Sequence, residues 1–446
     1  MLSNYIKLAW RILGKKKFFT FISLFGISFT LGILMVALSF LQSELGSNAP
    51  LSNKNDMILV PSLRLQQLHY DTITTIDTTY NNNVATYDTT YEYNQRGSNQ
   101  WNSDINNILI EEHMNDLDHA ADRTIFNANA NHDVFVNGIK LTLNTLYGDP
   151  NYWNIFDHNI IEGRTFDNNE MKNAAKVVVI SDKTAKEYFG NSNNAVGNEM
   201  YIDGKNFLVI GMYQNFGKMA PFVSPDAVIP YSNLNSDNQD SYYHGFYNVI
   251  YLKKESSSIQ ALKDNIIHAG SIVPLDHPSK PPGYNEIILR PETYNEMYAS
   301  AVYHDDDSSK SLKIMKWVLI CLLLFFILLP TLNLINLNIS RILERSAEIG
   351  VRKAFGAHQS NIINQFIIEN IVQTIIGGIL GLGLALALIS LINNGGYLGS
   401  AILKLNTKFF IYSFITITVF GILSGLLPAY RMSKLQIVNA LKENSL

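Results

Sequence analysis

The sequence predicts an α-helical membrane protein with four transmembrane helices and a large α+β extracytoplasmic domain between spans one and two. Three observations lead to this prediction. Long apolar segments lie near the N-terminus and in the C-terminal third of the 446-residue chain. A polar region rich in Asn, Asp and Tyr separates them. Lys and Arg gather beside the apolar segments, while the net charge is only −4, so no nucleic-acid partner is indicated.

The apolar segments are long enough to cross a hydrocarbon core, which takes about 20 residues. The first, Phe18–Leu41, has no charge and exceeds the h-region of a signal peptide, about 7–15 residues, so we expect a retained anchor. The others are Trp317–Leu337, a stretch over about 362–392, and Phe409–Leu427. Before the first span, a basic segment with Trp10 is typical of an amphipathic elbow helix lying on membrane lipid.

Glycines spaced four apart in the third span permit close contact between helices. Gly377 and Gly381 are the clearest such pair. We interpret them as packing positions within the subunit, with a dimer seam as the alternative. The single cysteine, Cys321, lies in the second span, so a disulfide within the chain is excluded.

Basic residues orient the spans. Five precede the first span, four follow the second and three lie in the C-terminal tail, against two between the third and fourth spans. This asymmetry predicts that both termini and the segment after span two are cytoplasmic, in the inner membrane of a bacterium. The predicted organisation is 1–17 elbow helix, 18–42 first span, 43–309 outer domain, 310–338 second span, 339–360 cytoplasmic segment, 361–392 third span, 393–408 outer loop, 409–428 fourth span and 429–446 tail.

The cytoplasmic segment 339–360 carries the candidate functional residues. Written as a helix, it places one set of residues on a narrow face of mainly small side chains and a charged set beside it. Gly350 favours a docking surface over a bland interfacial helix, because glycine inside a helix costs about 1 kcal/mol relative to alanine. Gly356 fits the left-handed position that ends a helix. The candidate residues are Leu343, Glu344, Ala347, Glu348, Gly350, Arg352, Lys353, Ala354 and Gly356.

The run EIGVRKAFGA, Glu348–Ala357, resembles the segment after the second span in FtsX-like permeases of the MacB type, which are membrane subunits of ABC transport systems. The tail from Pro428 also resembles that family, although Ile437 and Asn439 stand where proline and glutamate are usual. The outer region adds the family's turn and strand residues at Gly163, Arg164, Phe166, Phe189, Gly190, Val196, Gly197, Asp203, Gly204, Val209, Ile210 and Gly211.

This resemblance implies that segment 339–360 is the coupling helix that docks on an ABC ATPase. It further implies a pair of permeases, as a homodimer or with a related permease, that moves a drug, peptide or similar substrate already outside the membrane. A periplasmic adaptor and an outer-membrane channel stay open as partners. Two alternatives remain: release of lipoproteins from the membrane, and FtsX-like regulation of a cell-wall hydrolase.

The sequence contains no G-x-x-x-x-G-K-[ST] loop, HExxH, C-x-x-C or G-x-S-x-G motif. We therefore expect no enzyme activity, metal or cofactor in this chain, with ATP bound by a partner ATPase. The ten histidines are scattered, and we interpret each as a core or surface residue.

Local patterns also predict elements of the outer domain. They indicate a buried strand at Lys176–Ser181, a helix capped by Ser181, two strands joined at Asp203–Gly204 and a helix capped by Ser258. A helix from Pro291 toward the second span should break at the acidic run 305–307, a solvated break rather than a metal site. For residues 61–110 the pattern fits an exposed strand or a loop, and no role follows.

Overall fold

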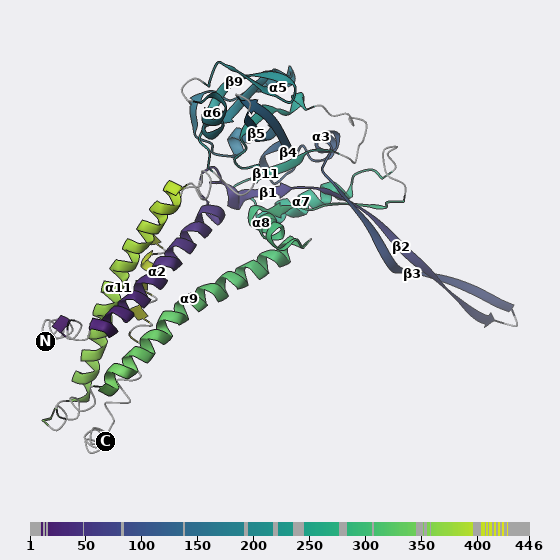
Figure 1. Cartoon of the computed structure of the whole chain (residues 1–446). Helices are drawn as coiled ribbons and strands as arrows, with labels where there is room; N and C mark the ends of the chain where they lie inside the picture. The colour runs from purple at the N-terminus through teal and green to yellow at the C-terminus, as the bar shows by residue number, and fades with distance from the viewer. Residues whose placement is uncertain are drawn as a thin grey trace. The chain divides into compact units, whose positions relative to one another are not determined.

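The structure is a computed structural model, and it divides the chain into two compact units, 47–312 and the combination of 1–46 with 313–446 (Figure 1). It describes residues 10–11, 14, 17–47, 49–81, 84–136, 139–190, 195–216, 222–234, 245–275, 283–305, 307–344, 351, 355–356, 358–395, 403–405, 407–408, 410–412, 414–415, 418–419, 422 and 426.

The elements follow one another along the chain with strands concentrated in the first unit named. In order they are α2 (Lys17–Leu45), η1 (Lys54–Asp56), β1 (Met57–Val60), β2 (Leu63–Asn81), β3 (Val84–Ser103), α3 (Asn107–His113), β4 (Ala120–Val136), β5 (Ile139–Gly148), α4 (Tyr152–Ile155), β6 (Ile160–Gly163), α5 (Asn168–Lys172), β7 (Val177–Ser181), α6 (Asp182–Phe189), β8 (Glu199–Ile202), β9 (Lys205–Tyr213), β10 (Ala227–Pro230), η3 (Tyr231–Asn233), β11 (Asn248–Lys253), α7 (Ile259–Ser271), β12 (Glu286–Leu289), β13 (Glu292–Thr293), α8 (Tyr294–Tyr303), α9 (Ser308–Glu344) and α11 (Gln359–Gly395).

The α+β unit is built on a mixed sheet in the order β13-β1-β11-β4-β5-β10-β7-β9-β6, with β8 paired to β9. Alternate residues of its strands enter separate cores, as the two-residue period of a strand requires. In β7, Val177 and Val179 join a core with Phe126 and Tyr152, whereas Val178 and Ile180 join the other. All five β7 residues are buried, which explains why this strand reads as a continuous apolar run.

The predicted caps and turns are confirmed. The Ser181 hydroxyl accepts a hydrogen bond from the backbone N–H of Thr184 at 3.1 Å, and α6 ends at Gly190 with φ +75°. Asp203 and Gly204 both have positive φ, +49° and +74°, as a tight hairpin between β8 and β9 requires. Ser258 caps α7 through the N–H of Ala261.

A second sheet, in the order β12-β2-β3, contains the region for which the sequence suggested no role. β2 and β3 are 19 and 20 residues long and pair with each other along their whole length. Figure 1 shows them running side by side away from β12 as a long hairpin. Residues 61–110 are therefore mainly an extended strand pair.

In the other unit, α2 and α11 pack through the glycines. A Cβ added at Gly377 would lie 2.7 Å from Ile27 Cγ2, and one at Gly381 would lie 3.0 Å from the Ser28 carbonyl oxygen. Such distances leave no room for a side chain, so the glycines set the close approach of the helices. The interpretation of these residues as packing positions within the subunit is confirmed.

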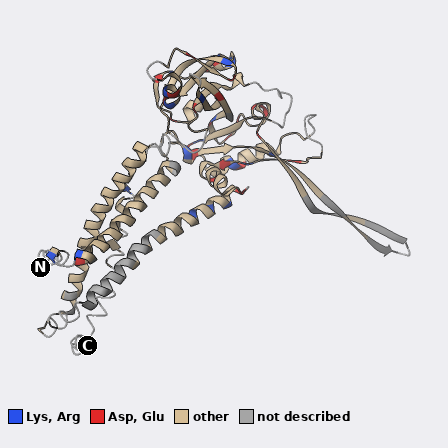
Figure 2. Ribbon diagram, in the orientation of Figure 1, with Lys and Arg blue, Asp and Glu red and all other residues tan. Residues whose placement is uncertain are grey.

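Two helices in the described part of the chain have the length and hydropathy of membrane spans, α2 over Thr20–Ser43 and α11 over Ile363–Gly395. Figure 2 shows few charged side chains along them. The second predicted span lies within α9, which is continuous from Ser308 to Glu344. The fourth, 409–428, falls largely outside the described residues, so the number of four spans and the domain boundaries stay predictions.

Candidate functional site

The predicted coupling segment lies only partly within the described residues. Leu343 and Glu344 form the C-terminal end of α9. Gly356 has φ +85°, the left-handed conformation expected of a glycine that ends a helix, and the neighbouring Phe355 is 89% exposed. The docking role of the whole set stays a prediction, because six of its members fall outside the described residues: Ala347, Glu348, Gly350, Arg352, Lys353 and Ala354.

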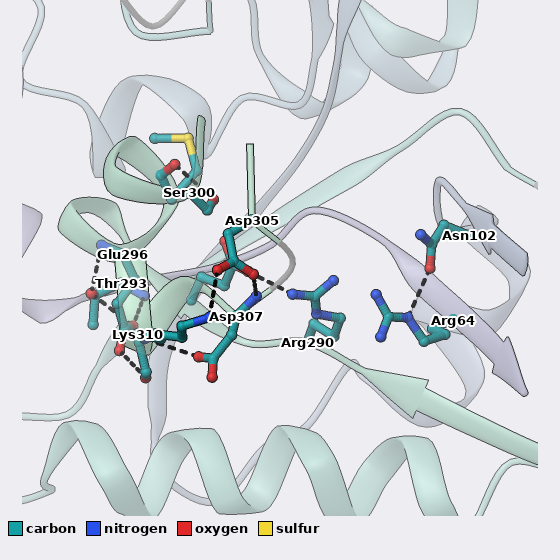
Figure 3. Close-up of polar contacts among 12 residues, drawn as sticks. Arg64, Asn102, Arg290, Thr293, Glu296, Ser300, Asp305, Asp307 and Lys310 are labelled. Atoms are coloured by element: carbon teal, nitrogen blue, oxygen red, sulfur yellow. Dashed lines mark hydrogen bonds and ion pairs between the residues drawn. The ribbon is translucent and has the colours of Figure 1, made fainter. Parts of the chain in front are cut away.

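The other end of α9 is better described, and it begins at a built break. α8 ends at His304 in the left-handed conformation, φ +52° and ψ +37°. The Asp307 carboxylate then accepts a hydrogen bond from the Lys310 backbone N–H at 2.9 Å, and the Lys310 ammonium lies 3.2 Å from Asp305 (Figure 3). The acidic run thus breaks one helix and caps the next, as the sequence led us to expect of a break.

Glu296 of α8 connects three helices at this break (Figure 3). Its Oε2 accepts hydrogen bonds from the Thr293 N–H at 2.8 Å and the Lys263 ammonium of α7 at 2.5 Å. Its Oε1 accepts from the hydroxyl of Ser309, in the first turn of α9, at 3.0 Å. We call Lys263, Thr293, Glu296 and Ser309 the Glu296 latch.

The latch is nearly closed to solvent. The side chains of Lys263 and Glu296 are 14% and 10% exposed. Burial opposes ionisation of Glu296, but the hydrogen bonds from Lys263 and Thr293 outweigh it and hold the pKa of Glu296 below its usual range. Removal of one partner from a buried ion pair costs about 3–5 kcal/mol, because the other charge is left without compensation. The latch therefore fixes the first turn of α9 to α7 and α8.

An open groove of about 500 Å³ borders the latch. Its charged residues are paired: Arg290 lies 3.7 Å from Glu292, and the Arg64 Nε donates to the Asn102 side chain at 2.9 Å (Figure 3). Burial raises the pKa of Glu292. The groove brings together opposite charges rather than a nucleophile with a base, so its chemistry is structural.

A second cavity, of about 530 Å³, lies beside Asp149. The buried Asp149 carboxylate accepts hydrogen bonds from the Thr124 hydroxyl at 2.6 Å and from the N–H of Ile125 at 3.1 Å. Burial raises its pKa to about 6. Its proton is therefore held more tightly in the folded than in the unfolded chain, and acidification toward pH 4 relieves the cost of a buried charge.

His158 has the opposite behaviour. Its Nε2 lies 3.1 Å from the Tyr152 hydroxyl, which also donates to the Phe222 carbonyl. Burial lowers the pKa of His158 to about 3, so the folded domain holds the neutral ring. This histidine is a core residue, as the sequence interpretation expected.

A buried polar strip opens α11. Gln365, Glu369 and Gln373 recur every four residues and are 6%, 6% and 2% exposed. The Gln365 amide donates to the Glu369 carboxylate at 2.9 Å. Ionisable side chains inside apolar helices are costly unless paired, and this pairing satisfies Glu369 within its own helix.

Sequence reasoning missed the latch. The Thr293-x-x-Glu296 spacing is a capping-box signature and could have marked the start of α8. Lys263, by contrast, is 33 residues away from Glu296, and no spacing rule joins them. Among the residues that the structure describes, no group of three or more His, Cys, Asp or Glu side chains is placed to hold a metal ion.

Two family models match the chain. Residues 20–269 match the MacB-like periplasmic core domain, and residues 320–437 match the FtsX-like permease C-terminal region. The first match covers more than half of the chain, and together the two matches reach from the first span into the tail.

Individual relatives agree with these matches. The chain is 27% identical over 306 residues to the macrolide export ATP-binding/permease protein MacB of Acinetobacter baylyi, covering 68% of this chain and 43% of that protein. It is 26% identical over 318 residues to the uncharacterized ABC transporter permease YknZ of Bacillus subtilis, covering 70% of each. The chain thus spans less than half the length of the MacB protein that it matches.

Solved structures include a domain of a putative permease protein from Porphyromonas gingivalis. It is 11% identical, covers 54% of this chain and 91% of that chain, and gives a TM-score of 0.37.

Proposed function

Because this chain belongs to the family of FtsX-like permeases with a MacB-like periplasmic core domain, we propose that it is the permease subunit of an ABC exporter whose ATPase is a separate chain. The proposed location is the bacterial cytoplasmic membrane, with both termini cytoplasmic, four spans and the α+β unit outside. ATP would be bound by the partner, with no cofactor in this chain.

The observation that carries the mechanism is the length of α9. Its 37 residues make a helix of about 55 Å at 1.5 Å per residue, whereas a hydrocarbon core is about 30 Å thick. One end holds Ser309 of the latch, and the other holds Leu343 and Glu344 of the proposed coupling segment. A displacement of the coupling segment would therefore reach the latch through one continuous helix.

We assign the coupling role to the face of Leu343, Ala347, Gly350 and Ala354, with Glu344, Glu348 and Arg352 along its edge and Lys353 and Gly356 at its end. Nucleotide-driven movement of the ATPase would shift this segment and, through α9 and the latch, the outer domain. The domain would then extrude a substrate from the outer side of the membrane.

Substrate and further partners extend this proposal. A named relative exports macrolides and another, from Pseudomonas syringae, exports pyoverdine. By analogy, a drug, a peptide or a similar compound is the proposed cargo. A second permease would complete the complex, and a periplasmic adaptor with an outer-membrane channel would extend it across the envelope.

The test uses the full chain with and without the ABC ATPase encoded in the same organism. We expect the purified chain alone to neither bind nor hydrolyse ATP, and the complex to hydrolyse it. Stoichiometric ATP binding by the chain alone would contradict the separate-ATPase proposal. Failure of any ABC ATPase of that organism to co-purify would contradict the permease assignment.

A further inference from the structure

The β2–β3 hairpin extends well past the sheet that holds its base. β12 pairs only with Leu63–Gln66 of β2, and from Gln67 to Asn81 the strand pairs only with β3. These residues form a two-stranded ribbon about 45 Å long at about 3.3 Å per residue. Figure 1 shows the ribbon leaving the domain. We call it the ribbon, and its ends are Gln67 and Asn99 at the base and Asn81 and Val84 at the tip.

The register divides the ribbon into two unlike faces. Residues directly opposite each other lie on the same face, and faces alternate along each strand. One face contains the pairs Thr72–Tyr93, Thr74–Tyr91, Ile76–Thr89 and Thr78–Tyr87, and between Tyr70 and Gln95 it carries no charged residue. The other face carries four carboxylates, at Asp71, Asp77, Asp88 and Glu92. We call these the tyrosine face and the acidic face.

Such a ribbon is poorly suited to standing alone in water. An isolated two-stranded hairpin is marginally stable, and unpaired strand edges invite association unless Lys or Pro blocks them. From residue 67 to 100 the sequence contains neither Lys nor Pro, and it is rich in the Thr and Tyr that favour strands. Ile76, on the tyrosine face, is 59% exposed.

From these observations we infer that the tyrosine face docks on the tyrosine face of a second copy of this chain. Hydroxyl groups both donate and accept hydrogen bonds, so a face of Thr and Tyr complements its own copy. Aromatic rings add favourable pair contacts. The acidic face excludes the reverse arrangement, because its four carboxylates would meet four more. Two identical faces related by a twofold axis give a closed dimer.

The size of the face sets where this contact forms. A ribbon about 45 Å long and about 10 Å wide offers roughly 450 Å² per copy. Stable interfaces between free proteins bury about 800 Å² per partner. The contact is therefore weak between free molecules and becomes effective when two copies are already held together, where effective concentrations reach about the millimolar range. In this respect the inference rests on the proposed pairing of two permeases.

The test compares two neighbouring threonines in full-length protein in its native membrane, with Cys321 replaced by Ser. Thr74 lies on the tyrosine face and Thr75 on the acidic face; both are exposed and near the middle of the ribbon. A bis-maleimide that spans about 10 Å, the spacing of stacked sheets, should join two Thr74→Cys chains into a covalent dimer. Thr75→Cys chains, whose cysteines would lie about 20 Å apart, should stay monomeric on the same gel.

A second pair of variants tests the chemistry of the face. In the Thr74→Cys chain, Tyr87→Asp places a charge on the tyrosine face and should abolish the covalent dimer. Thr86→Asp places the same charge on the acidic face and should leave it unchanged.

Equal cross-linking of Thr74→Cys and Thr75→Cys, or cross-linking of Thr75→Cys alone, would overturn the inference. So would the absence of any covalent dimer while the ATPase still co-purifies, an outcome that would leave the proposed function intact and indicate a different occupant. Loss of ATPase binding in both cysteine variants would contradict the proposed function instead.

Discussion

Replacement of Glu296 should release the start of α9 from the outer domain. Glu296→Gln keeps the shape of the side chain but leaves the Lys263 ammonium, only 14% exposed, without its carboxylate. Glu296→Ala also removes the acceptor for Thr293 and Ser309. We expect the first change to cost about 1–3 kcal/mol and the second about 3–5 kcal/mol of local stability.

These energies translate into opening rates of backbone amides. Each 1.4 kcal/mol is a factor of ten in an equilibrium, so amide exchange across Tyr294–Ser311 should accelerate about 10- to 100-fold in Glu296→Gln and about 100- to 1,000-fold in Glu296→Ala. Hydrogen exchange measured by mass spectrometry on the full chain reads this segment directly. Glu255→Gln provides the control, because Glu255 is exposed, and a surface change of this kind shifts stability by less than about 0.5 kcal/mol.

The same variants separate structure from coupling. In the complex with the ATPase, Glu296→Gln should retain ATP hydrolysis while ATP-dependent protection changes in the outer domain diminish. Exchange in Glu296→Gln that equals exchange in Glu255→Gln would refute the latch. Normal ATP-dependent changes in Glu296→Ala would refute its role in transmission.

Three further predictions concern topology, docking and pH. A cysteine at Asn394 should react with an impermeant maleimide in intact spheroplasts and one at Ser360 should not; labelling of Ser360 alone would contradict the orientation. Gly350→Leu adds bulk at the proposed close contact and should weaken ATPase co-purification about 5- to 150-fold, while Glu348→Lys should weaken it more at low salt than at high salt; unchanged yields in both would remove the docking proposal. Because the pKa of His158 is about 3 in the folded chain, against about 6.5 for a histidine in water, its contribution to stability is complete above about pH 6.5 and falls by at most about 1.4 kcal/mol per pH unit below it; denaturation of wild type and His158→Asn across about pH 4–7 checks this, and equal slopes would contradict it.

Predictions from the sequence succeeded where one local pattern decided the structure. The apolar run at Val177–Ser181 had to be a buried strand, and Ser181 and Gly190 had to bound the next helix. The glycines of the third span likewise indicated close packing before any partner was known. Each of these depends on residues that are neighbours along the chain, so spacing alone carries the information.

The ribbon shows where such patterns stop. Alternating Thr and Tyr fit both an exposed strand and a loop, because a strand with polar residues on both faces lacks the apolar alternation that marks a buried side. Only the pairing of Thr74 with Tyr91, and the register shift after His69, separates a neutral face from an acidic one. A shift of one residue would have mixed the two faces.

The sequence by itself determined the family, the apolar helices and the candidate coupling residues, because motif and hydropathy are properties of contiguous residues. Only the tertiary structure decided that Glu296 meets Lys263 and Ser309, and that α2 packs on the glycines of α11. Those contacts join segments tens to hundreds of residues apart. Their partners are selected by the shape of the folded chain and by the cost of burying a charge without its counterpart, and neither is written in any local pattern.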